Sequence, residues 1–407
     1  MARTFAVFID ALKPESLEHM NFLRSFNSRR VRTNLGYSNT CHASMYTGVY
    51  PNKHQSWFIW RYSQDSSPFK LLRRIGKYKH LNNTYLKFVS YFTLQFFSRR
   101  ERRRQIAGGL PLLVNQPLSN WSYFDPGMIS FTNEPNSDIG GYPTIFKILR
   151  ENRIAVGYHF CSKLTSIGKI IRKVIASYPR QDDRFDIVFI GELDALSHKY
   201  GQDSPRTIKE LELLDKALEQ GYRELSEKSP DFCFLLWSDH GQVKVESSVN
   251  LYDIFNVAGK SLTDYVHFVD SSFARFWFRN EKERLEIEEI LSQLNDKGYI
   301  LNREFLKRYH LDMPHDDYGQ LIYYLDRPYI FASGKLTIFG KDETSQVVSH
   351  HSFLPDYPDM DGIFLANRVL SKKLETHINL ESICASIMDL YDLEIPEYMD
   401  GVPVWSR

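Results

Sequence analysis

The chain has 407 residues, of which 43% are hydrophobic and 14% aromatic, and this composition allows a large buried core in one big domain or in two or three average ones. Its 51 basic residues balance 50 acidic residues, so the net charge does not indicate a nucleic-acid or membrane partner. No stretch approaches the roughly 20 apolar residues that a membrane-spanning helix needs.

The four cysteines are scattered and show no CxxC spacing, which argues against a disulfide framework and against a thiolate zinc site. The sequence opens MARTFAVFID, where an apolar run of only a few residues ends in a carboxylate, unlike a secretory signal peptide. We therefore expect a reducing compartment and a cytoplasmic protein, with peripheral membrane contact as an option.

Short apolar runs that end in a polar residue recur along the chain and predict strands buried on both faces. They cover residues 4–9, 154–160, 186–190 and 232–237. Helical patterns occur at residues 143–151 and 204–228, the second with apolar residues three to four positions apart. Strands that alternate with helices predict an α/β fold with a mostly parallel central sheet and helices on both faces.

Two segments interrupt this alternation, and we interpret them as insertions into a single catalytic domain of residues 1–407. The first, residues 56–142, is expected to form a basic, aromatic lid. The second, residues 258–345, is expected to form an α+β cap. It contains a predicted strand at 272–278, a predicted helix at 281–295 and an apolar segment at 321–333.

Residues 70–104 contain eleven Lys or Arg residues and one acidic residue, Glu101, with aromatic residues interleaved. A solvated charged face is the ordinary interpretation of such a run. A helix at a membrane surface is a second interpretation, and nucleic-acid binding is a third and the least favoured. We favour a lid that recruits an anionic substrate or an anionic lipid surface.

Acidic and histidine side chains stand near the ends of the predicted strands and again near the C-terminus. In chain order they are Asp10, Asp194, His198, Asp239, His240 and His351. Each alone is explained by a helix cap, a turn or a surface pair. Because ligands of parallel sheets bind beyond the carboxyl ends of the strands, their joint occurrence on this strand pattern predicts one site.

Three carboxylates and three imidazoles form a ligand set that suits zinc, with manganese as the alternative. Two such ions about 4 Å apart can hold the attacking and the leaving oxygen of a phosphoryl transfer. We therefore expect two divalent metal ions and a phosphate ester as the substrate.

A nucleophile is expected in the segment YSNTCHASMYTGVYPNKH, residues 37–54. A hydroxyl at the start of a helix, with its oxygen on a metal, would be activated toward phosphorus, and the helix N-terminus would offer N–H groups to the phosphate. Ser38, Thr40 and Ser44 all satisfy this chemistry, and N-capping is the alternative role for one of them.

The sequence resembles the alkaline phosphatase superfamily in four places. Residues 44–54, SMYTGVYPNKH, are similar to its S-x-x-T-G-x-Y-P-x-x-H segment. DALSHKYG at 194–201 and SDHG at 238–241 resemble its D-S-x-G-H-x-Y-G and S-D-H-G motifs. His351-Ser-Phe, followed by PDMDGIF at 358–364, resembles its last histidine motif. The resemblance is greatest to the branch of type I phosphodiesterases and nucleotide pyrophosphatases.

This resemblance implies roles for individual residues. In that family the nucleophile lies nine residues before the Thr of the TG pair, so counting back from Thr47 selects Ser38. One implied metal site comprises Asp194, His198 and His351, and the other comprises Asp10, Ser38, Asp239 and His240. The implied reaction cleaves a phosphodiester or pyrophosphate bond through a covalent phosphoserine intermediate. Implied substrates are anionic phosphate-containing small molecules, such as a nucleotide or nucleotide sugar, or lipid-linked compounds.

Several positions depart from the family pattern. The branch usually has Thr followed by Phe-Pro at the nucleophile, and Ser197 and Ser352 replace glycines beside two predicted histidine ligands. The phosphate-binding Asn of the family is missing near Ile59, so we expect Arg61 or the backbone N–H of Asn39 to hold the phosphoryl oxygens. The segment also lacks the Pro and Arg that follow the sulfatase nucleophile, which argues against a sulfatase.

Other activities on the same residues stay open as alternatives. They are a phosphomonoesterase, a phosphonate hydrolase and a non-catalytic anion- or lipid-binding relative. Two histidines compete for the last ligand position, and we prefer His351 to His350 because His351 carries the H-x-F spacing.

Overall fold

The computed structural model describes residues 3–70, 72, 87, 89, 112–127, 134–161, 167–177, 183–332, 347–371 and 377–405. The chain forms two compact units. The first combines Met1–Ser56, Ser130–Lys244 and Val347–Arg407, and the second combines Trp57–Ile129 and Val245–Gln346. The two segments of the second unit overlap the predicted insertions, whose roles as lid and cap stay predictions. The basic run 70–104 lies almost entirely outside the described residues.

A seven-stranded sheet forms the centre of the first unit. From one edge to the other its strands are β17 (His377–Asn379), β2 (Asn27–Arg32), β16 (Gly362–Ala366), β7 (Cys233–Trp237), β1 (Arg3–Ile9), β6 (Arg184–Ile190) and β5 (Ala155–Cys161). β16 runs antiparallel to both of its neighbours, and the remaining pairs are parallel. The predicted, mostly parallel central sheet is therefore confirmed.

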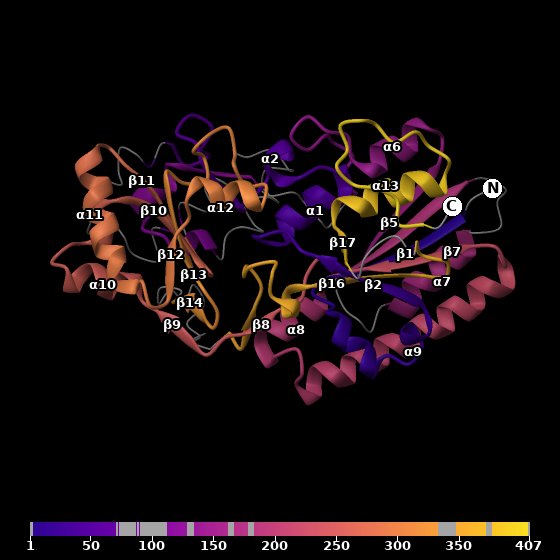
Figure 1. Ribbon diagram of the computed structural model, residues 1–407. Helices are drawn as coiled ribbons and strands as arrows, with labels where there is room; N and C mark the ends of the chain where they lie inside the picture. The colour runs from indigo at the N-terminus through magenta and orange to yellow at the C-terminus, as the bar shows by residue number, and fades with distance from the viewer. Residues whose placement is uncertain are drawn as a thin grey trace. The chain divides into compact units, whose positions relative to one another are not determined.

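The central strands bury side chains on both faces, as continuous apolar runs of this kind do. In β1, Phe5, Val7 and Ile9 belong to one core and Ala6 and Phe8 to the other, and all five are at most 1% exposed. The core of Phe8 is covered by α1 (Ser38–Thr47), α6 (Ile145–Glu151) and α13 (Glu381–Leu390). The core of Val7 is covered by α7 (Ile167–Ser177) and α9 (Pro205–Lys228), and Figure 1 shows α13 and α9 on opposite sides of the sheet. The prediction of helices on both faces is confirmed.

The observed elements of the first unit differ from the predicted ones by one or two residues at their ends. The helix predicted at 204–228 begins at Pro205 because Ser204 caps it. The Ser204 hydroxyl accepts the Thr207 N–H at 3.2 Å, and a proline at the first helical position sacrifices no helical hydrogen bond.

The second unit contains a four-stranded antiparallel sheet, in the order β10 (Val266–Asp270), β11 (Phe273–Trp277), β13 (Leu321–Leu325) and β12 (Gly298–Ile300). Phe255 of α10 (Leu251–Val257) and Ile287 of α11 (Glu281–Leu291) pack in one core with Phe276. The helix predicted at 281–295 ends earlier, at Leu291, where a 3₁₀ turn follows. The apolar segment 321–333 holds two strands, β13 and β14 (Tyr329–Phe331).

Each unit also contains shorter helices and strands. In the first unit they are η1 (Pro14–His19), η2 (Leu23–Ser25), α2 (Pro51–His54), α8 (Glu192–Tyr200), β8 (Val243–Lys244), β15 (Ser349–His350) and η8 (Pro358–Met360). In the second they are β3 (Trp60–Tyr62), α5 (Leu118–Trp121), β4 (Phe124–Pro126), β9 (Ser247–Val249), η6 (Leu262–Asp264), η7 (Ser292–Leu294) and α12 (Arg303–Arg308).

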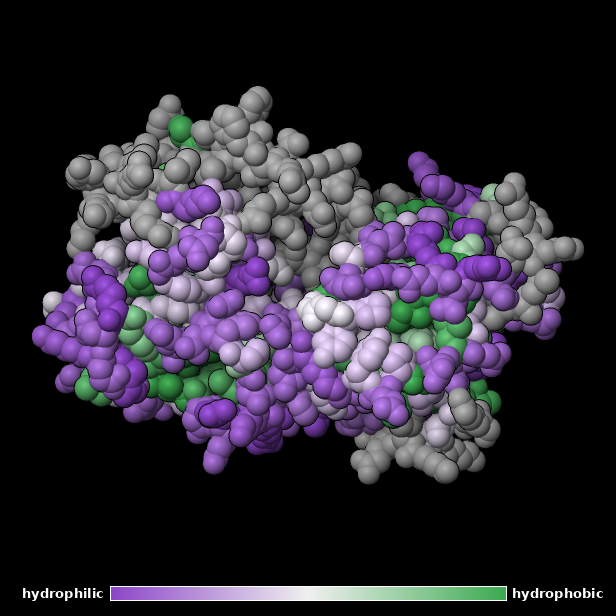
Figure 2. Space-filling view, turned by 90° about the horizontal axis from the view of Figure 1, so that it is seen from above, coloured by the Kyte–Doolittle hydropathy of each residue, from purple (hydrophilic) through white to green (hydrophobic). Residues whose placement is uncertain are grey.

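Hydrophilic residues cover most of the described surface on the face shown in Figure 2, and hydrophobic residues form separate smaller patches there. Within the described residues, no helix combines the length and the apolar character needed to cross a membrane. The four cysteines are buried and have free thiols.

Candidate active site

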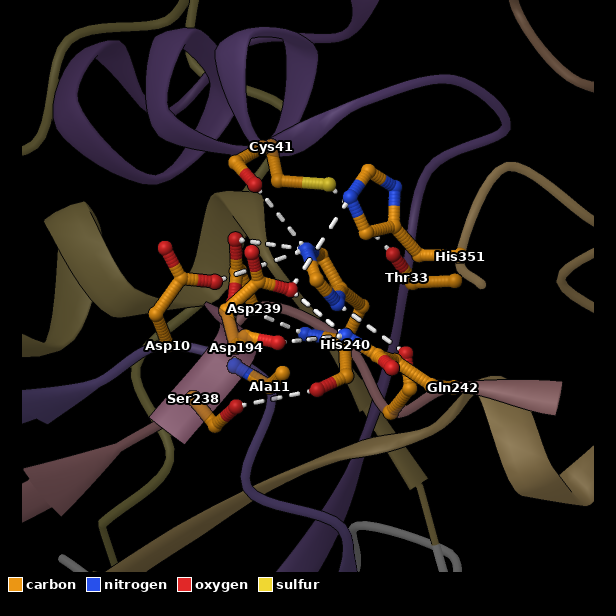
Figure 3. A network of polar contacts seen from close by, with 12 residues as sticks. Asp10, Ala11, Thr33, Cys41, Asp194, Ser238, Asp239, His240, Gln242 and His351 are labelled. Atoms are coloured by element: carbon orange, nitrogen blue, oxygen red, sulfur yellow. Dashed lines mark hydrogen bonds and ion pairs between the residues drawn. The ribbon is translucent and has the colours of Figure 1, made fainter. Parts of the chain in front are cut away.

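The site lies at the carboxyl ends of three neighbouring parallel strands. Asp10 follows β1, α8 with Asp194 and His198 follows β6, and Asp239 and His240 follow β7. Figure 3 shows Asp10, Asp194 and Asp239 converging on His240. Because parallel strands end at the same edge of a sheet, residues far apart in the sequence meet here. The structure therefore brings together the strand-end residues that the sequence singles out.

A first group of potential metal ligands comprises Asp194, His198 and His351. Asp194 and His198 are four residues apart on α8, so their side chains share one helix face, and His198 Nε2 lies 3.3 Å from Asp194 Oδ1. His351 follows β15, and its Nε2 lies 3.9 Å from the same oxygen. His351, rather than its neighbour His350, belongs to this group.

A second group centres on His240, which could hold an ion together with Asp10 and Asp194, so Asp194 is common to both groups. The Nε2 atom of His240 lies 3.3 Å from Asp239 Oδ2 and 3.6 Å from Asp10 Oδ1. Asp239 and His240 are at most 1% exposed and Asp10 is 9% exposed, so the three side chains have little contact with solvent.

Ser38 is the first residue of α1, and its Oγ lies 3.0 Å from His240 Nε2. The other ring nitrogen of His240 is 3.0 Å from the Gly241 carbonyl oxygen, which can only accept. We therefore assign a proton to Nδ1, and the other ring nitrogen, Nε2, is the atom that faces the Ser38 hydroxyl. Of the three candidate hydroxyls, Ser38 is the one that the structure places against His240, whereas Thr40 and Ser44 are fully buried.

The donor set fits bound cations. His198 Nδ1 lies 2.8 Å from the Ser349 carbonyl oxygen and carries the proton that this oxygen accepts. His198 Nε2 faces Asp194 Oδ1, and against the opposing effect of burial the Asp194 charge raises the pKa of His198. A cation bound between this nitrogen and the carboxylate would take the place of the proton. The buried oxygens Asp10 Oδ1 and Asp239 Oδ2 accept no hydrogen bond from the described residues, which leaves them free to coordinate an ion.

Burial, together with the neighbouring Asp239 charge, raises the pKa of Asp10 well above its ordinary value. Crowding of two carboxylates in a buried place has this effect whenever no positive charge compensates them. A divalent cation at this position would reverse the effect and keep Asp10 ionised. Against the opposing effect of burial, His240 and His42 already lower the pKa of Asp239.

Sequence reasoning missed His42, which lies beside the second group. His42 is fully buried, and its Nε2 is 3.5 Å from Asp239 Oδ2. The geometry places it with Asp10 and Asp239 in a third cluster that could hold an ion. The available signal was its position four residues after Ser38, which puts both side chains on one face of α1.

The two predicted substrate-binding residues are in different surroundings. Asn39 is the second residue of α1, and its side-chain amide donates to the Ser56 hydroxyl at 2.9 Å. Arg61 lies on β3 in the second unit, where its guanidinium is 3.3 Å from Asp125 Oδ2. The roles of Asn39 and Arg61 in substrate binding stay predictions.

The motif at residues 44–54 forms hydrogen bonds that stabilise α1 and the turn after it. Burial lowers the pKa of His54 to about 3, so the ring is neutral, and its Nδ1 accepts the Ser56 N–H at 3.0 Å. Its Nε2–H must then donate to Ser44 Oγ, 3.0 Å away. Gly48 ends α1 with a left-handed φ of 74°, a conformation that glycine adopts without strain. Ser44 and His54 are thus structural residues.

Solved structures with similar folds were found across nearly the whole chain. Human ectonucleotide pyrophosphatase/phosphodiesterase 5 matches with a TM-score of 0.68 at 12% sequence identity, covering 98% of this chain and 97% of that chain. Its murine counterpart matches with TM-scores of 0.63 and 0.64 at 13% identity, covering 97% of this chain and 96% of that chain, and one of these structures is an inactive variant in complex with AMP. No match was found among curated protein sequences.

The family model for type I phosphodiesterase/nucleotide pyrophosphatase matches residues 149–353, which is half of the chain. The matched segment contains the two central strands β6 and β7 and five of the six residues predicted as metal ligands from acidic and histidine side chains. The sequence resemblance and the fold agree with this match. The chain therefore belongs to the type I phosphodiesterase/nucleotide pyrophosphatase family and is a phosphoric ester hydrolase.

Proposed function

We propose that the protein hydrolyses phosphodiester or pyrophosphate bonds of anionic substrates, with Ser38 as the nucleophile. The observation that carries the proposal is the 3.0 Å contact between Ser38 Oγ and His240 Nε2. Ser38 begins α1, and His240 Nε2 in turn lies 3.3 Å from Asp239 Oδ2 and 3.6 Å from Asp10 Oδ1.

Two divalent metal ions would be held by the two groups of ligands. Asp194, His198 and His351 would hold one, and Asp10, Ser38, Asp239 and His240 would hold the other. Zinc suits these nitrogen and carboxylate ligands, with manganese as the alternative. When bound, the ions would lower the pKa of the nucleophile and offset the negative charge of the reacting phosphate.

Ser38 would attack phosphorus through Oγ, forming a Ser38–phosphoryl ester while the bond from phosphorus to the leaving oxygen breaks. Water would then cleave the new ester, returning the Ser38 hydroxyl and releasing the phosphoryl product. The N-terminus of α1 favours negative charge next to Ser38. We assign the Asn39 N–H, the next along this helix, as a donor to the phosphoryl oxygens.

A nucleotide is the substrate class that the comparisons favour, because a murine relative of similar fold forms a complex with AMP. The family's phosphate-binding Asn is missing near Ile59, so Arg61 is proposed as a second phosphate-binding group. The lid at 70–104 would add positive charge for an anionic or lipid-linked substrate.

A comparison of two synthetic substrates tests the proposal. The purified protein is analysed for zinc and manganese and is then assayed on bis(aryl) phosphate and on aryl phosphate at equal concentration. We expect two metal ions per chain and a higher kcat/KM on the diester. A preference for the monoester would identify a phosphomonoesterase instead. Metal-free protein with no activity above that of Ser38→Ala would contradict the enzyme mechanism and support a non-catalytic relative.

Peripheral membrane contact through residues 70–104 and a cytoplasmic location are proposed from the sequence, and the four free thiols support a reducing compartment. Sedimentation with liposomes at low salt tests the contact. Retention on vesicles rich in anionic lipid, and not on neutral ones, is expected. Equal recovery in the supernatant with both vesicle types would rule this contact out.

A further inference from the structure

We propose that Gln242 is a positioning residue that fixes one of the two metal-ligand groups, through hydrogen bonds to Asp194 on one side and Ser349 on the other. The inference rests on the proposed function, because it assigns Asp194, His198 and His351 to a metal. It concerns a residue that none of the sequence motifs includes.

Gln242 directly follows the SDHG motif and is 3% exposed. Its Nε2 donates to Asp194 Oδ1 at 2.6 Å and approaches the Asp194 backbone oxygen at 3.3 Å. Figure 3 shows the Gln242 side chain beside His240. The amide therefore restrains the side chain of Asp194 and the first turn of α8 together.

The other end of the same amide contacts Ser349, which is also 3% exposed. Ser349 Oγ lies 2.5 Å from Gln242 Oε1 and 2.6 Å from the Ser197 carbonyl oxygen, so two acceptors share its single proton. The orientation of the amide follows, because a carboxylate can only accept and the hydroxyl must donate. Both ends of the Gln242 side chain are thereby used.

Ser349 also restrains the other two ligands of this group, His198 and His351. Its carbonyl oxygen accepts from His198 Nδ1 at 2.8 Å, which holds the ring with Nε2 toward Asp194. β15, which begins at Ser349, pairs with β8, and in this register His350 lies opposite Val243. His351 is the next residue, so Gln242 and Ser349 tie α8 to the strand that presents His351.

A buried glutamine is costly unless its polar atoms are paired, and here all the observed partners belong to the ligands or to the segment that carries them. Groups that orient metal ligands from outside typically change metal affinity about 10- to 100-fold when they are removed. Gln242 touches the Asp194 group and has no observed hydrogen bond to Asp10 or Asp239 among the described residues. We therefore expect the zinc dissociation constant to change more at the site of Asp194, His198 and His351 than at the other site.

The test measures zinc binding rather than catalysis. Metal-free wild type, Gln242→Met and Gln242→Glu are titrated with Zn²⁺ in competition with a chromogenic chelator, and the Tm of each protein is recorded. Gln242→Met keeps the volume and loses both hydrogen bonds, so we expect one of two zinc sites to weaken by about 10- to 100-fold. Gln242→Glu, which faces Asp194 with a second carboxylate, is expected to alter the same site more than the other one.

Gln116→Met is the matched control, because Gln116 is also a buried glutamine with both amide ends bonded, to Val269 N and O at 3.0 and 2.8 Å. It is expected to lower Tm without changing either zinc constant. Unchanged zinc constants in Gln242→Met, or equal losses in Gln116→Met, would overturn the inference. If Gln242→Met does not fold, Ser349→Ala removes the hydrogen bond to Gln242 Oε1 and must weaken zinc binding at the same site.

Failure of the inference and failure of the proposed function give different results. A wild type that binds two zinc ions but cleaves neither diester nor monoester contradicts the function and leaves the zinc titrations valid. A wild type that cleaves diesters, with a Gln242→Met variant that binds zinc equally well, contradicts the inference alone.

Discussion

Ser38 Oγ lies 3.0 Å from His240 Nε2, and the Gly241 carbonyl oxygen accepts the proton of His240 Nδ1. Nε2 is therefore the ring atom that faces the hydroxyl at the start of α1. An ion held by both atoms, as proposed above, would take the place of this contact and would favour the deprotonated form of Ser38.

Replacement of Ser38 separates chemistry from folding. We expect Ser38→Ala to lose about 10³-fold or more in kcat/KM with an unchanged Tm, because loss of a nucleophile removes the covalent route. Ser38→Thr restores a hydroxyl and is expected to retain activity within about tenfold, on the scale where each 1.4 kcal/mol is a factor of ten. Ser226→Ala on α9 is the matched control, and activity of Ser38→Ala equal to that control would contradict the assignment.

Metal removal is expected to destabilise the first unit. Asp10, Asp194 and Asp239 converge on one place, and without cations their charges repel. An ion present at 100 times its dissociation constant adds about 2.7 kcal/mol to the free energy of unfolding. We expect chelation to lower Tm and zinc to restore it. Asp10→Asn removes one charge and should respond less to chelator than wild type, whereas a chelator-independent wild-type Tm would exclude tightly bound metal.

Ser352, next to the predicted ligand His351, has a φ of 78°. Left-handed backbone costs a residue with a Cβ on the order of 1 kcal/mol, and glycine avoids this cost. The glycine that the family has at this position is explained by that conformation. Ser352→Gly is expected to be at least as stable as Ser352→Ala in denaturant unfolding, and Ser352→Val to be less stable than both. A glycine variant weaker than the alanine variant would show that backbone strain is not the governing effect.

Ser44 is expected to matter for stability and not for chemistry. Its hydroxyl oxygen accepts Asn34 Nδ2 at 2.7 Å and lies 3.0 Å from His54 Nε2, with all partners inside the first unit. Ser44→Ala leaves buried donors unpaired, at a cost of about 1–3 kcal/mol in the free energy of unfolding. Activity per folded molecule should stay near that of wild type. A well-folded Ser44→Ala with no activity would instead point to Ser44 as the nucleophile.

Burial raises the pKa of Glu381 to about 7, from an ordinary value of 4.5. The folded state then holds the proton more tightly than the unfolded state, so this group's contribution to stability is complete below pH 4.5 and is lost as the pH rises through 7. Since one pKa unit is worth about 1.4 kcal/mol, wild type should lose about 2–3 kcal/mol between pH 5 and pH 8 through this group.

Glu381→Gln mimics the protonated carboxyl group and removes that titration. Its free energy of unfolding relative to wild type should rise between pH 5 and pH 8, measured by denaturant unfolding at both values. Glu394→Gln, at an exposed position near the C-terminus, is the control. A constant difference between Glu381→Gln and wild type across this range would refute the prediction.

The sequence predicted much of the site because its signals were local. Asp10 and Asp239 close apolar strands, and the end of a parallel strand has a known place in the fold. His42 was missed although its spacing from Ser38 was visible. Gln242 could not be predicted, because its contact with Ser349 joins positions 107 residues apart and depends on which short strands pair.

The surroundings of Arg61 could not be predicted either, because they depend on the pairing of two strands that are far apart in the sequence. The register of β3 against β4 places Arg61 opposite Asp125, and no pattern in the sequence specifies that register. The helix predicted at 281–295 was too long for a similar reason. The charged pattern continues beyond Leu291, but the backbone tightens into a 3₁₀ turn there and Leu294 packs into the core.

The position of β16 affects the order in which the protein can be completed during synthesis. β16 lies between β2 and β7, yet it is made more than a hundred residues after β7, and His351 only shortly before it. A nascent chain that ends before residue 351 already carries Ser38 but has neither the bridging strand nor the last ligand. The complete ligand set for the two proposed ions therefore exists only after residue 351 has been made, so both ions could be bound together only late in synthesis.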